Sequence, residues 1–209
     1  MSRIFDRYAE EYDVWFDKNE EVFRSEIEAV KRFIPERKDG IEVGVGSGRF
    51  ASQLSIEIGI DSSLSMLRIA KSRGVEVLLA KAEDLPFDDS SFDFVLMVTT
   101  LCFLEESLKA ISESKRVLKD DGRIIIGMID KDSFLGRKYE SNKQESIFYK
   151  DADFYSIEGV IDMLQGSGFE QIKTVQTLFK DIDQIGSVEE IKEGYGEGGF
   201  VVLSAVKTN

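Results

Sequence analysis

The sequence contains no histidine and a single cysteine, Cys102, among its 209 residues. These absences exclude a Ser-His-Asp triad, any mechanism that needs a histidine base, an internal disulfide bond and the common zinc ligand sets. Cys102 itself lies in the apolar run "VTTLCFL", where a small buried hydrophobic residue is expected rather than a nucleophile. No metal site is therefore predicted.

Long hydrophobic runs are also missing. The most apolar segment, residues 92–104, includes Asp93 and is too short for a membrane-spanning helix, which needs about 18 residues or more. The first residues, "MSRIFDRYAEEYD", are rich in acids and lack the apolar core of a signal peptide. We therefore predict a cytoplasmic protein that does not insert into a membrane.

Positive charge is scarce as well. The chain has 27 basic and 40 acidic residues, which gives a formal net charge of -13 at pH 7. A charge of this sign repels phosphate backbones and anionic membrane surfaces. Nucleic acids and membranes are therefore not expected as partners.

What the chain does contain is an alternation of strand-like and helix-like segments. The predicted strands are residues 41–44, 56–60, 75–79, 92–98, 123–129, 169–179 and 200–206, and the helices between them are 49–54, 63–73, 105–118 and 156–165, with a short one near 187–193. Such alternation predicts a mostly parallel sheet covered on both faces by helices. Sheets of this kind bind ligands at the carboxyl ends of their strands.

Two segments stand outside this alternation. Residues 1–35 carry apolar and aromatic side chains at helical spacing and predict one or two amphipathic helices that end at Pro35. Residues 131–155 mix charges with aromatics and predict a cap. We expect residues 1–209 to form a single domain in which these two segments cover the ligand site.

The run "IEVGVGSGRF", residues 41–50, leads from a predicted strand into Gly44, Gly46 and Gly48. Glycines at every second position allow a tight turn and let a ligand approach the backbone, while the next helix offers free N–H groups. Asp61 ends the following strand, where a carboxylate can accept hydrogen bonds from both hydroxyls of a ribose. This pattern predicts a nucleotide-like cofactor.

Glu42 helps to decide which cofactor fits. A carboxylate beside the turn offsets the positive groups of S-adenosylmethionine and would repel a pyrophosphate. The run "GSGRFA" nevertheless satisfies the dinucleotide fingerprint when counted from Gly46, although Asp61 then follows sooner than that fingerprint requires. An NAD(P)-dependent oxidoreductase and a non-catalytic cofactor-binding module therefore remain alternatives.

Four segments resemble, in order, the motifs of class I S-adenosylmethionine-dependent methyltransferases. They are "IEVGVGSG", "GIDSSLSMLRIAKSRG", "AEDLPFDDSSFDFVLMVTTLCFL" and "ISESKRVLKDDGRIIIG". The similarity is to the small-molecule branch that includes ubiquinone and menaquinone methyltransferases. It implies S-adenosylmethionine as cofactor and a Rossmann-like, doubly wound α/β fold, with a seven-stranded, mostly parallel sheet, an antiparallel last strand and an N-terminal helical lid.

The resemblance also implies a set of cofactor-binding residues. They are Glu42, Gly44, Gly46, Gly48, Asp61, Ser62, Met66, Ala82, Glu83, Asp84 and Thr99. The sequence departs from the family at Lys81, where many relatives have an aspartate, and at Cys102 and Phe103, where many have a histidine. The segment between Gly48 and Asp61 is short and predicts a stubby first helix.

Methyl transfer from a sulfonium is an in-line displacement with a neutral leaving group, so alignment matters more than acid-base catalysis. No catalytic residue is assigned; if a base is used, Tyr8, Tyr12 and the aromatics of residues 131–155 are available. The aromatic content favours a small acceptor, either an amine or a partly apolar metabolite, and the negative chain would attract a cation. The sequence leaves the methylated atom and the oligomeric state open.

Overall fold

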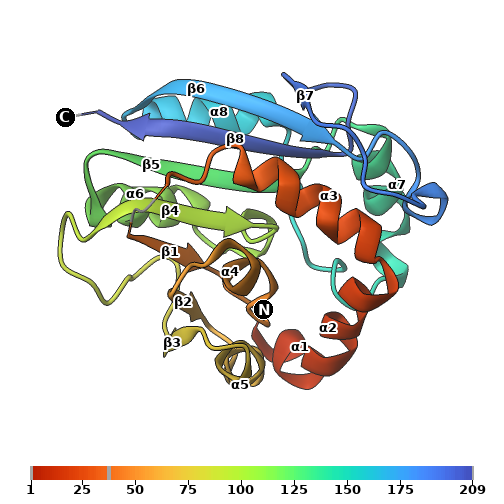
Figure 1. Ribbon diagram of the computed structural model, residues 1–209, viewed down its shortest axis with the longest axis horizontal. Helices are drawn as coiled ribbons and strands as arrows, with labels where there is room; N and C mark the ends of the chain where they lie inside the picture. The colour runs from red at the N-terminus through yellow and green to blue at the C-terminus, as the bar shows by residue number, and fades with distance from the viewer. Residues whose placement is uncertain (1, 37–38, 209) are drawn as a thin grey trace.

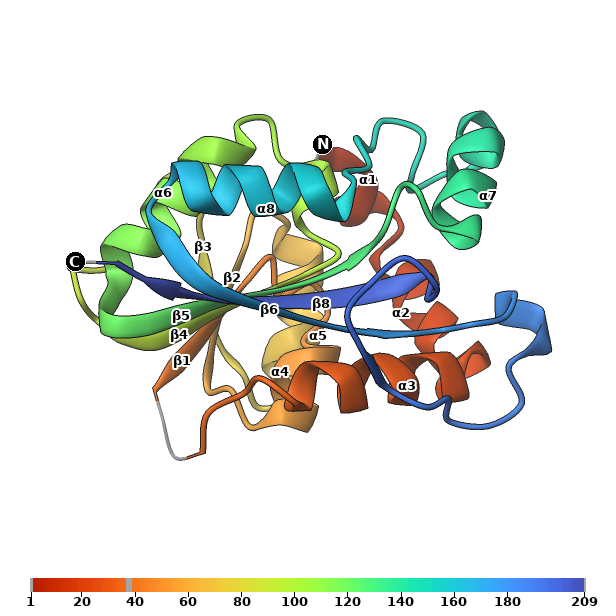
Figure 2. The ribbon, with the colours of Figure 1, turned by 90° about the horizontal axis from the view of Figure 1, so that it is seen from above.

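The computed structural model describes residues 2–36 and 39–208. A central sheet is covered by helices on both faces: α6 and α8 lie on one side, and α3, α4 and α5 lie on the other (Figure 2). The strands follow the order β3-β2-β1-β4-β5-β8-β6-β7. This is the doubly wound arrangement that the alternating pattern predicts.

The strands are β1 Gly40–Val43, β2 Ile58–Asp61, β3 Glu76–Leu79, β4 Phe92–Val98, β5 Leu118–Ile129, β6 Phe169–Thr177, β7 Lys192–Glu193 and β8 Phe200–Lys207. β1 pairs in parallel with β2 and β4, β2 with β3, and β4 with β5, whereas β8 runs antiparallel to both β5 and β6. The seven predicted strands and the antiparallel last strand are thus confirmed. β5 begins earlier than predicted because the "KDDG" turn joins the strand, with Asp121 at a φ of 59°.

The structure has one strand more than the seven predicted, β7, and it shows that the helix predicted near residues 187–193 is wrong. Residues 187–191 form no helix, and Lys192–Glu193 form a strand that pairs antiparallel with β6. The Thr177 hydroxyl donates to the carbonyl oxygen of Glu190 at 3.0 Å, and the Glu189 N–H donates to the Ser25 hydroxyl at 2.9 Å. Because these tertiary contacts take up the backbone groups, they override the helical propensity of the segment.

The helices are α1 Ser2–Arg7, α2 Ala9–Lys18, α3 Glu20–Lys31, α4 Arg49–Leu54, α5 Leu64–Ser72, α6 Ser107–Val117, α7 Phe134–Asn142 and α8 Ile157–Gly166. One-turn 3-10 helices occur at Leu101–Phe103, Lys143–Glu145 and Ile182–Gln184. Ser63, Ser133 and Ser156 begin α5, α7 and α8 because their side chains accept N–H groups of the first turn. None of the helices in the described ranges combines the length and apolar character of a membrane span.

The N-terminal segment forms three helices, where one or two were predicted. The second break falls at Asn19, whose side-chain amide donates to the Trp15 carbonyl oxygen at 2.8 Å and so ends α2. α4 has only six residues, which confirms the stubby helix predicted after the glycine turn.

The core has two parts, one on each face of the sheet. Successive side chains of a strand point to opposite faces, so Leu96 and Val98 of β4 join the cluster under α3 and α4, while Val95 and Met97 join the cluster under α6 and α8. The strands are continuously apolar because both faces are covered. In Figure 1 the arrows of β4 and β5 point toward α2 and α7, so the lid and cap segments lie at the carboxyl end of the sheet.

Candidate active site

A cavity of about 230 Å³ lies at the carboxyl ends of β1, β2 and β4. We call it the first cavity. It is lined by Phe5, Tyr12, Gly44, Gly46, Ile60, Asp61, Ser62, Met66, Ala80, Lys81, Ala82, Glu83, Val98, Thr99, Thr100, Phe103, Leu104 and Glu105. Its position is the one where parallel sheets bind ligands.

Most of the predicted cofactor-binding residues meet at the first cavity: Gly44, Gly46, Asp61, Ser62, Met66, Ala82, Glu83 and Thr99. Three do not line it. Glu42 is buried within the sheet, Gly48 is packed under α5, and Asp84 is exposed outside the cavity. Phe5, Tyr12 and Lys81 do line it, although the sequence did not assign them to the cofactor.

The three glycines of the turn are needed for different reasons. All have positive φ angles, 74° at Gly44, 52° at Gly46 and 77° at Gly48, which favour glycine. A Cβ atom at Gly44 would lie 2.3 Å from the Thr100 side chain, and one at Gly48 would lie 2.9 Å from Ala70. At Gly46 it would meet nothing within 4 Å. Gly46 is therefore the position where the backbone is bare toward open space and a ligand can approach.

Asp61 fixes this turn to the end of β2. One of its carboxylate oxygens accepts the Gly46 N–H at 2.9 Å and the other accepts the Ser63 N–H at 2.8 Å. Burial raises the pKa of Asp61, although these backbone donors lower it. Because the Gly46 N–H is already bonded to a carboxylate, it is not free to hold a pyrophosphate, and this disfavours the dinucleotide alternative.

Glu42 lies two residues before Gly44 and is only 2% exposed. Its Oε2 atom has no hydrogen-bond partner in the described part of the chain, and burial raises the pKa of this carboxyl group well above its usual value. Buried polar atoms nearly always have a partner, so an oxygen without one two residues before the glycine turn is an unusual feature. A carboxyl group here fits a cofactor that carries positive groups.

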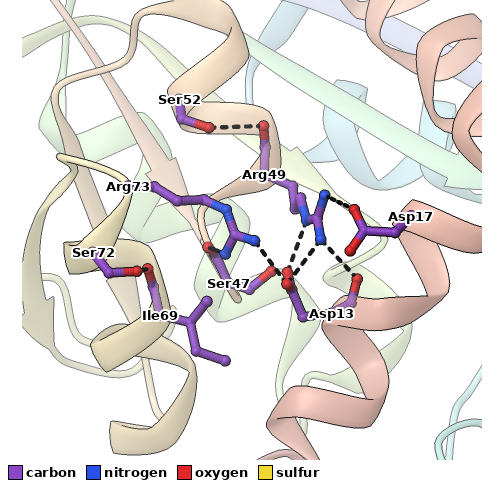
Figure 3. Close-up of polar contacts among 8 residues, drawn as sticks. All are labelled: Asp13, Asp17, Ser47, Arg49, Ser52, Ile69, Ser72 and Arg73. Atoms are coloured by element: carbon purple, nitrogen blue, oxygen red, sulfur yellow. Dashed lines mark hydrogen bonds and ion pairs between the residues drawn. The ribbon is translucent and has the colours of Figure 1, made fainter.

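The N-terminal helices are tied to the turn by charged hydrogen bonds (Figure 3). The Arg49 guanidinium donates to both carboxylate oxygens of Asp13, at 2.8 Å each, and to Asp17 at 2.6 Å. Arg73, which directly follows α5, donates to Asp13 at 2.7 Å and to the backbone oxygen of Ser47, inside the turn, at 2.8 Å. Asp13 therefore connects α2, the glycine turn and α5 at one point.

Replacing Asp13 by asparagine is expected to lower the free energy of unfolding at pH 7 by about 2 kcal/mol, because two guanidinium groups lose a charged acceptor. Burial acts to raise the pKa of Asp13, but the bonds from Arg49, Ser47 and Arg73 lower it to about 2 from 3.8. A lowered carboxyl pKa means that this stabilisation is present above pH 3.8 and is lost as the pH falls toward about 2. Urea denaturation at pH 7 and pH 3 measures both effects.

The matched control is Asp17→Asn on the same helix, because the Asp17 side chain is 64% exposed while that of Asp13 is 14% exposed. A clearly smaller loss of stability is expected for this variant. An equal loss in the two variants would show that Asp13 has no special place in connecting the helices to the turn.

A second cavity of about 110 Å³ lies beside the first. It is lined by Glu11, Tyr12, Trp15, Phe16, Glu26, Phe50, Thr99, Ile129, Leu135, Tyr139, Phe148, Tyr149, Leu178 and Ile182. Tyr12 and Thr99 line both cavities, so they form the boundary between them. Thr99 has a φ of 48°, which is rare for a β-branched residue and is typical of a site where the surrounding structure imposes a position.

Glu26 is the residue of the second cavity that the sequence analysis missed. It follows Phe23 by three residues and directly precedes Ile27, within the apolar helical pattern of residues 1–35. Phe23, Glu26, Ile27 and Val30 share one helix face at this spacing. An acid on an apolar helix face was the signal that could have revealed it.

The hydroxyl and thiol groups near the cavities are not bases at neutral pH. Burial raises the pKa of Tyr12, although a hydrogen bond with the Thr99 side chain lowers it, and burial raises the pKa of Tyr149 as well. Burial also raises the pKa of Cys102 to about 12, so its thiol stays protonated. Cys102 thus behaves as the sequence predicts, without the properties of a nucleophile.

A doubly wound sheet with a bare glycine turn and an aspartate at the end of the next strand is the architecture of enzymes that bind a nucleotide-like cofactor, which include the S-adenosylmethionine-dependent methyltransferases. Residues 41–126 match the family described as "Methyltransferase domain". The whole chain is similar to the crystal structure of a SAM-dependent methyltransferase of Thermotoga maritima, named a possible histamine N-methyltransferase, with 49% identity, a TM-score of 0.97 and 100% of both chains covered. The chain belongs to this family of S-adenosylmethionine-dependent methyltransferases, and it is an enzyme whose cofactor is S-adenosylmethionine.

The chain is also similar to two further proteins. An uncharacterized protein of Methanocaldococcus jannaschii is 58% identical over 204 residues, which cover 98% of each chain. A demethylmenaquinone methyltransferase of Thermotoga maritima is 32% identical over 136 residues, 59% of each chain, and gives weaker support to the menaquinone branch. The oxidoreductase and the non-catalytic module are therefore set aside.

Proposed function

We propose that the chain transfers a methyl group from S-adenosylmethionine to a small-molecule acceptor, mainly by holding the two molecules in line. The observation that carries this proposal is the pair of cavities that meet at Tyr12 and Thr99. One has the glycine turn and Asp61 in its wall, and the other is enclosed by the lid and the cap. Its volume of about 110 Å³ suits a metabolite better than a polymer.

In this proposal the first cavity binds the cofactor. Gly44 and Gly46 let it approach the backbone and Asp61 accepts the ribose hydroxyls, while Glu42, which does not line the cavity, acts from behind the glycine turn with the oxygen that has no partner. The remaining contacts come from Ser62, Met66, Ala82, Glu83 and Thr99, whereas Gly48 and Asp84 lie in the same loops without lining the cavity. When bound, S-adenosylmethionine supplies an electrophilic methyl group on its sulfonium.

The protein's own contribution is positioning and the exclusion of water. Tyr12 and Thr99 separate the two cavities, so they set the line along which acceptor and methyl group meet. Holding two reactants in line contributes about 7 to 11 kcal/mol in favourable cases. We further propose that residues 1–35 and 131–155 act as lid and cap of one domain, and that the enzyme works in the cytoplasm.

The name of the Thermotoga maritima relative supports a small amine among the acceptors. The aromatic walls of the second cavity agree with an acceptor that is either cationic or partly apolar.

Calorimetry with S-adenosylhomocysteine tests the cofactor half of the proposal. Gly46→Ala is expected to weaken binding about tenfold or more, because its methyl group enters the open space of the first cavity. Gly74→Ala is the matched control, since Gly74 also has a positive φ, 86°, and open space around it, but lies outside the cavity. Both variants are expected to lose about 1 kcal/mol of stability, and only the first to lose affinity.

Methyl-labelled S-adenosylmethionine tests the transfer. With a pool of small metabolites, the label is expected to move into the low-molecular-weight fraction. No binding of S-adenosylhomocysteine at millimolar concentration by the folded protein would overturn the proposal, as would label that reaches only macromolecules.

A further inference from the structure

We propose, on the basis of the proposed function, that the second cavity binds the ammonium group of a small primary or secondary amine, with the carboxylate of Glu26 as its counter-ion. The amine is then the methyl acceptor. The inference names a substrate class and a recognition residue for the acceptor half of the site.

Glu26 is a buried acid without a partner. It lies on α3, is 6% exposed, and lines the second cavity. Within residues 2–36 and 39–208 no hydrogen bond or ion pair satisfies its carboxyl group, and burial raises its pKa. Unpaired buried charges are costly and are rarely kept in a fold unless a ligand completes them. A ligand that supplies N–H donors and a positive charge would satisfy the Glu26 carboxylate.

The walls around Glu26 suit a cation. Half of the residues that line the cavity are aromatic: Tyr12, Trp15, Phe16, Phe50, Tyr139, Phe148 and Tyr149. They support one another through ring contacts, with ring centroids 5.2 Å apart for Tyr12 and Phe148 and 4.9 Å apart for Tyr139 and Tyr149. Ring faces attract ammonium groups, and the same rings would surround the apolar body of an amine.

The charges of the cavity argue against other occupants. Its two charged side chains in the described part of the chain are the acids Glu11 and Glu26, and no lysine or arginine lines it, so an anion would be repelled. A metal ion would need more ligands, and the described residues contain no group of three or more suitable side chains. A neutral alcohol supplies no positive charge to stabilise the ionised form of Glu26.

The same arrangement serves the reaction. An ammonium ion must lose one proton before its nitrogen has a lone pair, and Glu26 is the buried carboxylate of the cavity that can take it. The nitrogen then forms a bond to the methyl carbon while the carbon–sulfur bond breaks and its electron pair goes to sulfur. The products are the methylated ammonium ion, a neutral thioether and the proton on Glu26, which passes to solvent.

The experiment compares binding of matched probes to the full chain saturated with S-adenosylhomocysteine. The probes are 2-phenylethylamine with 2-phenylethanol, and cyclohexylmethylamine with cyclohexylmethanol, all measured by calorimetry. The wild-type protein is expected to bind at least one amine about tenfold or more tightly than its alcohol. Glu26→Gln is expected to remove this preference and leave the affinity for S-adenosylhomocysteine unchanged.

Glu11→Gln is the matched control, because Glu11 lines the same cavity but is exposed. It is expected to keep the preference for the amine. The inference is overturned if wild-type protein binds neither amine better than its alcohol, or if Glu26→Gln keeps the preference. Failure of the proposed function looks different, since S-adenosylhomocysteine then fails to bind or no methyl group is transferred.

Discussion

Replacing Glu26 by glutamine is expected to raise the free energy of unfolding by about 4 kcal/mol at pH 8 and by about 1 kcal/mol or less at pH 5. Burial raises the pKa of Glu26 from 4.5 to about 8. The unfolded chain therefore loses this proton at lower pH than the folded protein does. Stability from the neutral acid is present below pH 4.5 and is lost as the pH rises toward about 8. An isosteric amide stays neutral and removes this dependence.

Urea denaturation of both proteins at pH 5 and pH 8 measures the effect. The other titratable groups that face the cavity are Glu11, Tyr12, Tyr139 and Tyr149. Burial raises the pKa of each of these tyrosines, so they stay neutral at pH 8 in both proteins. The difference between the two pH values therefore reports on Glu26.

Glu28→Gln is the control for this measurement. Glu28 lies on the same helix, its side chain is 48% exposed, and it pairs with Lys31. It is expected to change stability little at either pH. If Glu26→Gln were destabilising at pH 8, or if its effect were the same at both pH values, Glu26 would not be the buried acid described above.

A residue whose removal stabilises the fold is unusual and informative. Most substitutions of buried residues destabilise, and the exceptions concentrate at sites where function needs an unfavourable group. A Glu26→Gln protein that is more stable and has lost its preference for amines would link the stability measurement to the binding measurement. The carboxylate would then be retained for recognition at a cost to stability.

Asp61→Ala is expected to weaken the binding of S-adenosylhomocysteine by about 1.5 to 3 kcal/mol, which is roughly 10- to 150-fold. Its carboxylate bonds the N–H groups of Gly46 and Ser63, so its loss releases the glycine turn. In our proposal it also loses the acceptor for the ribose hydroxyls. Calorimetry measures the affinity, and circular dichroism verifies that the variant is folded.

Asp84→Ala tests whether the sequence pattern or the cavity in the structure identifies the cofactor-binding residues correctly. The resemblance to the family places Asp84 among the cofactor-binding residues, but its side chain is exposed outside the first cavity. We therefore expect Asp84→Ala to change the affinity by less than about twofold. An unchanged affinity in Asp61→Ala would refute the role given to Asp61, and a loss in Asp84→Ala equal to that in Asp61→Ala would show that the cavity is wrongly assigned.

The glycine turn shows how much structure a local sequence pattern can predict. Strand, turn and helix 41–54 follow from the spacing of three glycines, and Asp61 follows from its place at the end of the next strand. The structure adds the reason for each glycine, because Gly44 and Gly48 avoid Thr100 and Ala70 while Gly46 faces open space. Those neighbours come from other elements, and no local spacing records them.

The sequence by itself determined the alternation of seven strands with the helices between them, the cofactor turn and the class of enzyme, because all of these depend on residues close together in the chain. Only the tertiary structure decided what surrounds the acceptor. Asp13 meets Arg49 and Arg73 across 36 and 60 residues, and these contacts fix how the N-terminal helices lie on the sheet. Glu26 lines the second cavity only after α2, α3 and the cap have packed together. The physical reason is that a helical period shows which side chains share a face, whereas the partner of that face is set by long-range packing.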